Sequence, residues 1–476
     1  MNGKARLPGK GHNLHEHAKA GGVGRTEAGL SGAKSGGKKR PASAGPTASV
    51  EAARAKVSAS RWAAFEILTL VGAGKGHSDE LLHSARVEAL SPEDRNLTTT
   101  LVMGVLRWQI ALDARVRGLL QRPEQRLAEA VAIALRMGAF QLVYLDRIPA
   151  HAALSESVEL CRAAGEPHAT GMVNAVLRKV ASAKPTSQNR DGGHPERMVP
   201  LYESVAAFSE RLGHPRWMVE RWAAAYGREA ALKICEADQR EPVGSGMFAE
   251  NGGTLPVMDD GSRLVAELAA AAMPGARRVW DCCAAPGGKT LILVRRLGSA
   301  EVVASDVSGK RLAQMEARLR RYGHRERVRC VVADATEARG IEGEFDLILC
   351  DAPCSGTGTL AANPEIRHRL RPEEFVRQAQ RQRAILSGAL ARLAPGGRLV
   401  YSTCSLEPEE CERVVEGVAS LRRVPVEGLI EELVGQGILP DGARLDSAVR
   451  DGALRTLPGA HDCDGFYAVV LERGGF

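Results

Sequence analysis

The chain has 476 residues, a formal net charge of +7, and 44% hydrophobic and 25% charged residues. This length and composition are typical of a soluble globular protein with two or three domains. The sequence shows no apolar signal segment and no apolar run long enough for a bilayer, so we expect a cytoplasmic protein without a membrane partner. The ten cysteines include no Cys-x-x-Cys pair, which predicts free thiols and neither a disulfide framework nor a metal site.

The first half of the chain divides by composition. Residues 1–50 are rich in Gly, Ala, Ser, Lys and Arg and predict a disordered basic arm, which either touches RNA or is a tail without function. Apolar residues recur at helical spacing over residues 51–183, and this pattern predicts an all-helical domain. Residues 184–200 are a predicted polar linker, and residues 201–261 a small connecting region of helix and loop.

Strand and helix patterns alternate over residues 262–476. We expect βαβ units around a parallel sheet, which is an α/β, Rossmann-like domain. The predicted strands end at Asp281 or cover 301–305, 328–332, 345–350, 398–403 and 466–471. The predicted helices cover 264–273, 289–297, 309–322, 373–394 and 407–420.

A ligand site is expected where the first strands end, because ligands of such sheets bind beyond the carboxyl ends of the strands. The first strand is followed by Cys283, Ala284, Ala285, Pro286, Gly287, Gly288 and Lys289. This spacing matches neither a dinucleotide fingerprint nor a Walker A loop. Asp306 ends the second strand and is placed to accept ribose hydroxyls, while Asp334 after the third could bracket an adenine edge. The layout fits S-adenosylmethionine, although either acid alone could instead be a helix cap.

Two cysteine motifs end the next two buried strands. Asp351–Cys354 and Ser402–Ser405 bring two thiols and a carboxylate to the same edge of the sheet. Such a pairing suggests covalent chemistry on an electron-poor ring. The alternative is that each cysteine only fills space in the core, as we expect for Cys282 and Cys350 within the strands.

These motifs together resemble a known family. Residues 284–290, 351–358, 401–405, 457–460 and 464–467 resemble RNA cytosine-5 methyltransferases. Residues 140–144, 148–154 and 173–178 are similar to the NusB-like domain of one branch, the RsmB/Sun type, which acts on small-subunit (16S) ribosomal RNA. The resemblance implies an all-α NusB-like RNA-binding domain followed by a class I methyltransferase domain. The chain departs from the pattern over residues 241–258, a region that looks short and that is expected to help hold RNA in relatives.

The resemblance also implies roles for single residues. Cys404 would be the nucleophile, and Cys354 would help to release the methylated product. Residues 283–289, with Asp306, Asp334 and Asp351, would form the S-adenosylmethionine site. The expected partner is RNA, most of all ribosomal RNA, and the expected oligomeric state is a monomer. A transfer RNA substrate and a non-catalytic, antitermination-type RNA-binding factor remain as alternatives.

The chemistry explains why such a site needs a thiolate. A thiolate that adds to carbon 6 of cytosine makes carbon 5 nucleophilic, and a helix that begins near Pro408 could stabilise the Cys404 thiolate. Asp351 could hold the N3/N4 edge of the ring if it is protonated or shares a proton. Arginines in and before the helix 373–394 either face RNA or lie on a solvated surface; they are Arg367, Arg369, Arg371, Arg377, Arg381 and Arg383.

Overall fold

A computed structural model describes residues 48–183, 203–242, 247–248, 257–418, 421–440 and 445–474. All of these residues belong to one compact unit. Apart from residues 48–50, the predicted basic arm lies outside the described residues, as do the predicted linker 184–200 and most of the short region 241–258. None of the helices in the described ranges is long and apolar enough to span a membrane.

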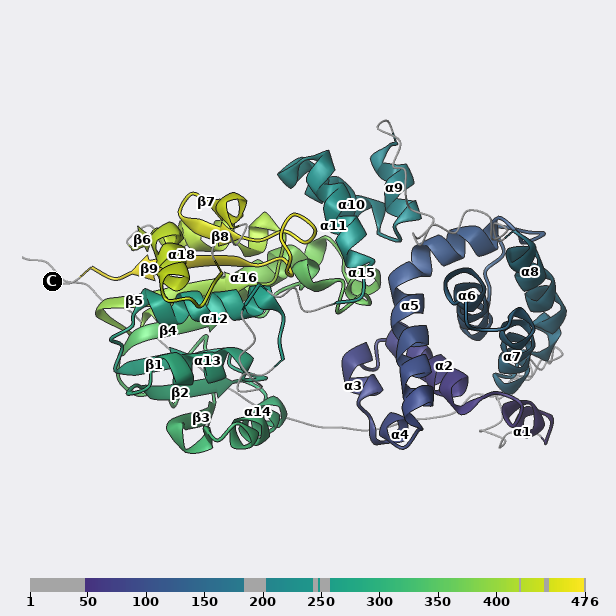
Figure 1. Cartoon of the computed structure of the whole chain (residues 1–476), viewed down its shortest axis with the longest axis horizontal. Coiled ribbons are helices and arrows are strands. Elements are labelled where there is room, and N and C mark those ends of the chain that lie inside the picture. The colour runs from purple at the N-terminus through teal and green to yellow at the C-terminus, as the bar shows by residue number, and fades with distance from the viewer. Residues whose placement is uncertain are drawn as a thin grey trace, which may run out of the picture. The chain divides into compact units, whose positions relative to one another are not determined.

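The N-terminal part is helical, as the sequence predicts (Figure 1). Its helices are α1 (Ala48–Arg54), α2 (Ala59–Gly72), α3 (Ser78–Leu82), α4 (Ala85–Glu88), α5 (Pro92–Arg117), α6 (Glu129–Tyr144), α7 (Ala150–Ala163) and α8 (Thr170–Ser182). The Ser91 hydroxyl caps α5 by accepting from the Asp94 amide, and Pro92 occupies its first turn. Helices α5 and α6 pack closely, because a Cβ at Gly104 would lie 1.9 Å from the Phe140 ring. Only glycine fits at this crossing.

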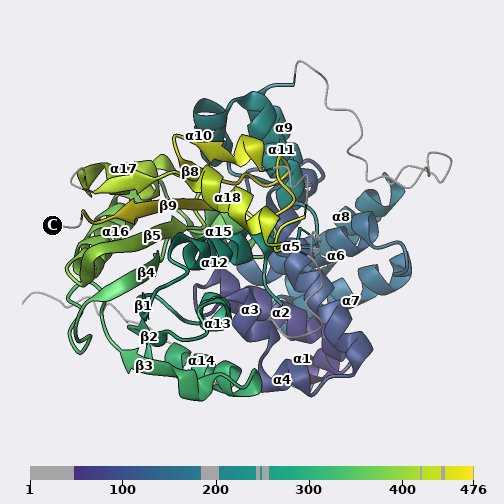
Figure 2. The ribbon, with the colours of Figure 1, turned by 60° about the vertical axis from the view of Figure 1, so that its left-hand side comes forward.

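Three helices follow in the middle of the chain (Figure 2). They are α9 (Val205–Arg211), α10 (Arg216–Tyr226) and α11 (Arg228–Asp238). Phe208 and Trp222 are buried in a core that they share with Leu360 and Leu406 of the C-terminal part. The Trp222 indole also donates to Glu407 over 3.1 Å. The middle helices therefore pack directly beside the two loops that follow the cysteine motifs.

The C-terminal part is built on one sheet with the order β3-β2-β1-β4-β5-β9-β8-β7 and β6 paired with β9. The strands are β1 (Arg278–Asp281), β2 (Glu301–Asp306), β3 (Val328–Val332), β4 (Phe345–Asp351), β5 (Leu393–Thr403), β6 (Arg422–Val424), β7 (Val449–Arg450), β8 (Ala453–Arg455) and β9 (Tyr467–Glu472). Strands β1 to β5 pair in parallel, which confirms the predicted α/β character. The sheet is mixed beyond these five strands, since β9 pairs antiparallel with β5.

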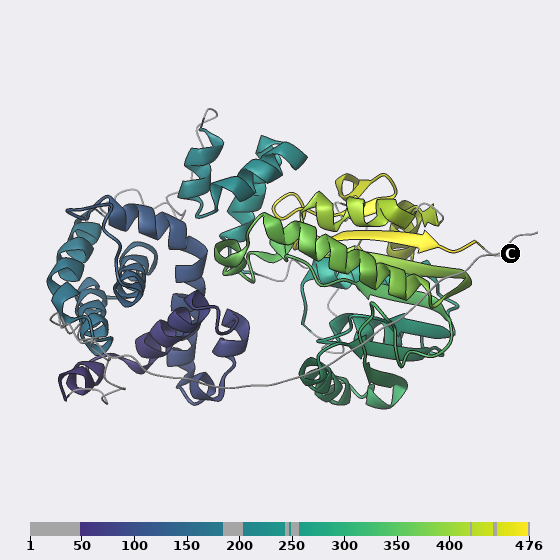
Figure 3. The ribbon, with the colours of Figure 1, turned by 180° about the vertical axis from the view of Figure 1, so that it is seen from behind.

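Helices cover both faces of this sheet (Figure 3). Leu347 and Leu349 of β4 point into one core with α12 (Asp260–Ala272), α13 (Gly288–Arg296), α14 (Gly309–Arg321) and α18 (Val426–Gly435). Ile348 and Cys350 point into the other core, with α16 (Glu373–Leu390). This alternation along one strand is what buries both faces.

One predicted helix is wrong. The sequence predicts a helix over residues 407–420, but the structure has three short turns: η5 (Pro408–Glu410), α17 (Glu412–Val415) and η6 (Glu416–Val418). Cys411 separates the first two with φ −117° and ψ −102°, which is not a helical conformation. A three-residue turn does not sum the peptide dipoles of a helix, so the expected stabilisation of a Cys404 thiolate by a helix N-terminus has no basis here.

Candidate active site

A cavity of about 280 Å³ lies at the carboxyl ends of the parallel strands. The segments after β1 to β5 and helix α16 form its walls. The lining residues are Cys282, Cys283, Ala285, Pro286, Asp306, Val307, Arg311, Ala333, Asp334, Ala335, Asp351, Ala352, Pro353, Cys354, Arg381, Ile385 and Cys404. The cavity thus brings together most residues of the predicted cofactor site and both residues of the predicted cysteine pair.

Four residues of the predicted cofactor site are not among the lining residues. Ala284 is buried and donates its amide to the Ser305 carbonyl over 2.8 Å. A Cβ at Gly287, where φ is +94°, would lie 2.6 Å from Met315 of α14, and one at Gly288 would touch Met258. The glycines therefore allow close packing of the loop within the protein. Lys289, the fourth, lies in the first turn of α13 and reaches Asp351.

The two acids after β2 and β3 use their carboxylates differently. Asp306 Oδ1 accepts from the Ser308 amide over 2.8 Å, and its Oδ2 lies 3.4 Å from Arg311. The cap of α14 is Ser308, whose hydroxyl accepts from the Arg311 amide. Helix capping therefore does not explain Asp306. Asp334 is exposed and accepts from the Thr336 amide over 2.9 Å, a hydrogen bond that lowers its pKa.

The two cysteines lie side by side. The Sγ atoms of Cys354 and Cys404 are 3.3 Å apart. The hydrogen bond with Cys404 and burial both raise the pKa of Cys354, so this thiol keeps its proton at neutral pH. The Cys354 loop packs closely on Gly465 of the last predicted motif, because a Cβ at Gly358 would lie 2.1 Å from the Gly465 carbonyl.

An ion pair joins the loop after β1 to the first cysteine motif. Lys289 Nζ lies 2.7 Å from Asp351 Oδ2 and also donates to the Ser262 hydroxyl over 2.7 Å. Burial lowers the pKa of Lys289, but the Asp351 carboxylate outweighs this effect and the pKa is raised. Ser402 donates to the other oxygen of Asp351 over 2.8 Å. The sequence places Lys289 in the cofactor site but does not reveal that it pairs with Asp351.

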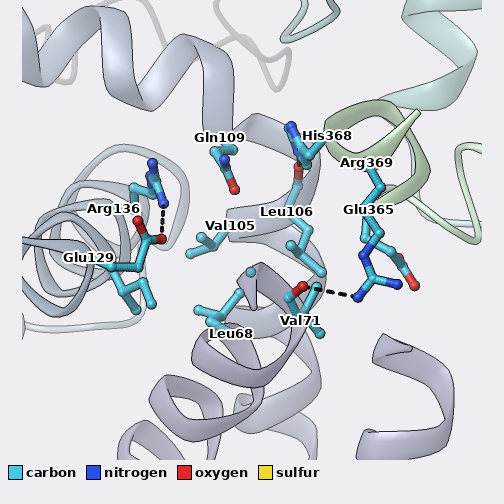
Figure 4. A pocket seen from close by; sticks show the side chains of 12 residues that line it. Leu68, Val71, Val105, Leu106, Gln109, Glu129, Arg136, Glu365, His368 and Arg369 are labelled. Atoms are coloured by element: carbon cyan, nitrogen blue, oxygen red, sulfur yellow. Dashed lines mark hydrogen bonds and ion pairs between the residues drawn. The ribbon is translucent and has the colours of Figure 1, made fainter. Parts of the chain in front are cut away.

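Two of the six arginines that could face RNA are instead used inside the protein. Figure 4 shows one of them, Arg369. Both lie in the short helix α15 (Ile366–Arg369). Arg367 is 1% exposed and donates to the carbonyls of Arg107 and Gly213. Arg369 donates to the Val71 carbonyl over 3.0 Å and to that of Gly76. Sequence position suggested a surface role, but the helical part covers these side chains. Arg371, Arg377, Arg381 and Arg383 remain exposed.

Comparison with known proteins identifies the family. Residues 271–472 match the family 16S rRNA methyltransferase RsmB/F, and residues 58–182 match the NusB family. The "Probable ribosomal RNA small subunit methyltransferase B" of Bacillus subtilis (strain 168) is 30% identical, over 87% of this chain and 98% of its own length. The "Ribosomal RNA small subunit methyltransferase B" of Xanthomonas campestris is 31% identical, over 87% of this chain and 97% of its own length. The chain belongs to the 16S rRNA methyltransferase RsmB/F family.

This membership confirms the predicted fold class and class of enzyme. A solved structure described as "Crystal Structure of PH0851" shares the fold with a TM-score of 0.62 at 21% identity, over 88% of this chain and 99% of that one. The helical part is NusB-like, and the sheet carries the methyltransferase domain. As an RsmB/F protein the chain is an S-adenosylmethionine-dependent methyltransferase.

The cavity fits this cofactor. Asp306 and Asp334 offer carboxylate oxygens, which can accept hydrogen bonds from the hydroxyl and amino groups of a nucleoside. Val307 also lines the cavity and is 56% exposed, although it is apolar. A bound adenosine would cover this side chain. Sequence reasoning missed Arg311, Arg381 and Ile385 as lining residues, because helix periodicity does not show which turn reaches a cavity.

Proposed function

We propose that this chain methylates carbon 5 of a cytosine in 16S ribosomal RNA through a covalent bond between Cys404 and carbon 6 of the ring. The observation that carries this proposal is the pair of thiols 3.3 Å apart in the wall of the cavity that also holds Asp306, Asp334 and Asp351. Two cysteines and a carboxylate in the wall of one cavity are the groups that this reaction needs.

S-Adenosylmethionine, when bound, supplies an electrophilic methyl group. Residues of the chain would hold it through Asp306 and Asp334 and through the apolar side chains of Pro286, Val307 and Ile385. Cys283 and Ala285 would complete this wall together with Asp351. Two kinds of role follow for the loop after β1. Ala285 and Pro286 would touch the cofactor, whereas Gly287 and Gly288 would shape the loop by packing on α14 and Met258.

Cys404 would attack as the thiolate, forming the bond to carbon 6 and pushing an electron pair onto carbon 5. Asp351 would accept from the amino group of cytosine at the N3/N4 edge. It shares a hydrogen-bonded proton with Lys289, whose ammonium compensates the charge of the carboxylate. Water would then take the proton from carbon 5; the electron pair of that C–H bond re-forms the double bond to carbon 6, the carbon–sulfur bond breaks, and Cys404 departs as a thiolate. Cys354, which keeps its proton, would donate a hydrogen bond to that departing thiolate and so ease release.

A groove in the NusB-like part supports its proposed role in RNA binding. The groove encloses about 730 Å³ between the segment after α5 and helix α8. Its rim carries Arg122, Arg126, His168 and Lys179, and none of the described residues that line it is acidic. Such a surface favours the phosphates of RNA, and its affinity should fall steeply with salt.

Tritium release tests the reaction. The enzyme is incubated with S-adenosylmethionine and 16S ribosomal RNA that carries cytidine labelled with tritium at carbon 5. Methylation replaces this tritium, so we expect its release into water in proportion to methyl transfer. Binding of the cofactor without release would contradict the reaction, and release from transfer RNA alone would favour the transfer RNA alternative.

Because ribosomal subunits assemble in the cytoplasm, that location remains the expected place of action, and a monomer remains the expected state.

A further inference from the structure

The two cysteine loops share one buried carboxylate, that of Glu410. Its Oε1 accepts from the Ser355 amide over 2.9 Å, and its Oε2 accepts from the Ser405 hydroxyl over 2.5 Å. The Ser355 hydroxyl also donates to Oε2. Ser355 directly follows Cys354, and Ser405 directly follows Cys404. One side chain therefore holds the residue next to each thiol.

Further hydrogen bonds hold the side chain and the backbone of Glu410 in place. Gln382 of α16 donates to Glu410 Oε1 over 3.2 Å and to the Pro353 carbonyl over 3.0 Å. The Tyr401 hydroxyl donates to the Glu410 carbonyl over 2.7 Å. The Cys354 loop is thus tied on both sides of its thiol, at Pro353 and at Ser355. Glu410 itself is 0% exposed.

The charge of Glu410 is balanced by hydrogen bonds from neutral groups. Every hydrogen-bond donor to its carboxylate in the described part of the chain belongs to Ser355, Ser405 or Gln382. Burial raises the pKa of Glu410, and these hydrogen bonds oppose the shift. A buried carboxylate held by neutral donors is costly for stability alone. Because the carboxylate lies between the two cysteine loops, we look to the reaction for the reason why the chain keeps it.

We propose that Glu410 is a positioning residue for methyl transfer, which fixes the Cys354 and Cys404 loops so that their thiols lie side by side. This inference rests on the proposed function for its kinetic consequence, but the spacing of the thiols can be measured without it. Glu410 is not among the residues that line the cavity, so it acts through Ser355 and Ser405, the neighbours of the two cysteines.

Two substitutions of Glu410 separate the effect of its hydrogen-bonding shape from the effect of its charge. In Glu410→Gln the amide oxygen can still accept from the Ser355 amide and from Gln382. Its NH2 group can donate to the two serine hydroxyls, which can also act as acceptors. Glu410→Ala loses every one of these contacts. A positioning role therefore predicts a small effect for glutamine and a large one for alanine.

The kinetic test measures kcat and KM for tritium release. For Glu410→Ala we expect kcat to fall about 100-fold, because a misplacement of about 1 Å can cost this much, with little change in KM for RNA. For Glu410→Gln we expect a loss of no more than about threefold. Glu409→Gln is the matched control: it makes the same change one residue away, where the carboxylate contacts Arg221 and Arg413 instead. We expect this control to keep wild-type kcat.

A second readout measures the thiols directly. Phenylarsine oxide reacts with two adjacent thiols to form two As–S bonds and releases one water, without any change in the oxidation state of sulfur. We expect tight binding by the wild type, Glu410→Gln and Glu409→Gln, and binding reduced to the level of Cys354→Ser in Glu410→Ala. The Cys354→Ser variant measures what the other cysteines bind. The double variant Ser355→Ala/Ser405→Ala gives the same test if Glu410→Ala does not fold.

The outcomes separate the two proposals. Wild-type arsenical binding in both Glu410→Ala and the double variant would overturn the positioning role, whatever the enzyme methylates. A loss of kcat in Glu410→Gln as large as in Glu410→Ala would overturn it as well, because charge and not geometry would then be required. If the wild type releases no tritium, the proposed reaction fails, while the arsenical result still decides the spacing of the thiols.

Discussion

Arg367 gives the sharpest test of how the NusB-like part joins the methyltransferase domain. Its guanidinium Nη1 donates to the Arg107 carbonyl of α5 and to the Gly213 carbonyl after α9, each over 3.2 Å. Its Nη2 lies 3.5 Å from the Asp238 carbonyl at the end of α11. One catalytic-domain side chain therefore ties together three elements from earlier in the chain. Arg367→Ala removes all of these contacts at once.

The expected change in the free energy of unfolding of Arg367→Ala follows from these contacts. A hydrogen bond from a charged donor stabilises a protein by about 1.5–3 kcal/mol, so the two bonds at 3.2 Å contribute about 3–6 kcal/mol. Burial of the charge works in the opposite direction, since it lowers the pKa of Arg367 to about 10. After this offset we expect a net loss of about 3 kcal/mol in the free energy of unfolding.

Urea unfolding and RNA binding together measure the effect. We expect a lower urea midpoint for Arg367→Ala, while the slope of RNA affinity against salt concentration stays that of the wild type. Arg383→Ala is the control for stability: Arg383 is exposed, and its loss should change the free energy of unfolding by no more than about 0.5 kcal/mol. If Arg367→Ala kept wild-type stability and reduced the salt slope by about one, Arg367 would be an RNA contact and the reasoning would fail.

Three further predictions concern single charged groups. Burial raises the pKa of Asp238 from 3.8 to about 7. The free energy of unfolding of the wild type, compared with that of Asp238→Asn, should therefore fall as the pH rises from about 4 to about 7. Equal pH profiles of the two proteins in urea unfolding would refute this. Asp306→Ala should weaken binding of S-adenosylhomocysteine by about 10- to 100-fold in calorimetry, and an unchanged Kd would remove Asp306 from the cofactor site. Lys289→Met leaves the Asp351 carboxylate without its cation and should lower kcat for tritium release by at least about tenfold, whereas wild-type turnover would show that the pair is not needed.

The sequence predicts features that lie next to a strand end. Asp306 and Asp351 end recognisable apolar strands, and Cys354 and Cys404 come shortly after such strands. Parallel strands bring their carboxyl ends to one edge of the sheet. Their meeting in one cavity is therefore a consequence of periodicity and topology. The helical character of residues 51–183 was predictable for the same reason, because long amphipathic helices have a strong period.

Other features depend on contacts between distant parts of the chain. Arg367 and Arg107 are 260 residues apart, and nothing in the local pattern shows that the arginine is covered. Strands β6 to β8 are too short to show a period in the sequence, and no local pattern shows that β9 runs antiparallel to β5. Glu410 lies in what resembles the acidic first turn of a helix, and only the structure shows that it turns inward to Ser355 and Ser405.

The central claim, a covalent bond from Cys404 to the cytosine ring, can be tested by the mass of a trapped complex. RNA that carries 5-fluorocytidine at the target should trap the enzyme with S-adenosylmethionine, because carbon 5 then has no proton to lose. The account predicts a stable protein–RNA adduct for the wild type and for Cys354→Ala, and none for Cys404→Ala. An adduct that persists in Cys404→Ala and disappears in Cys354→Ala would contradict it.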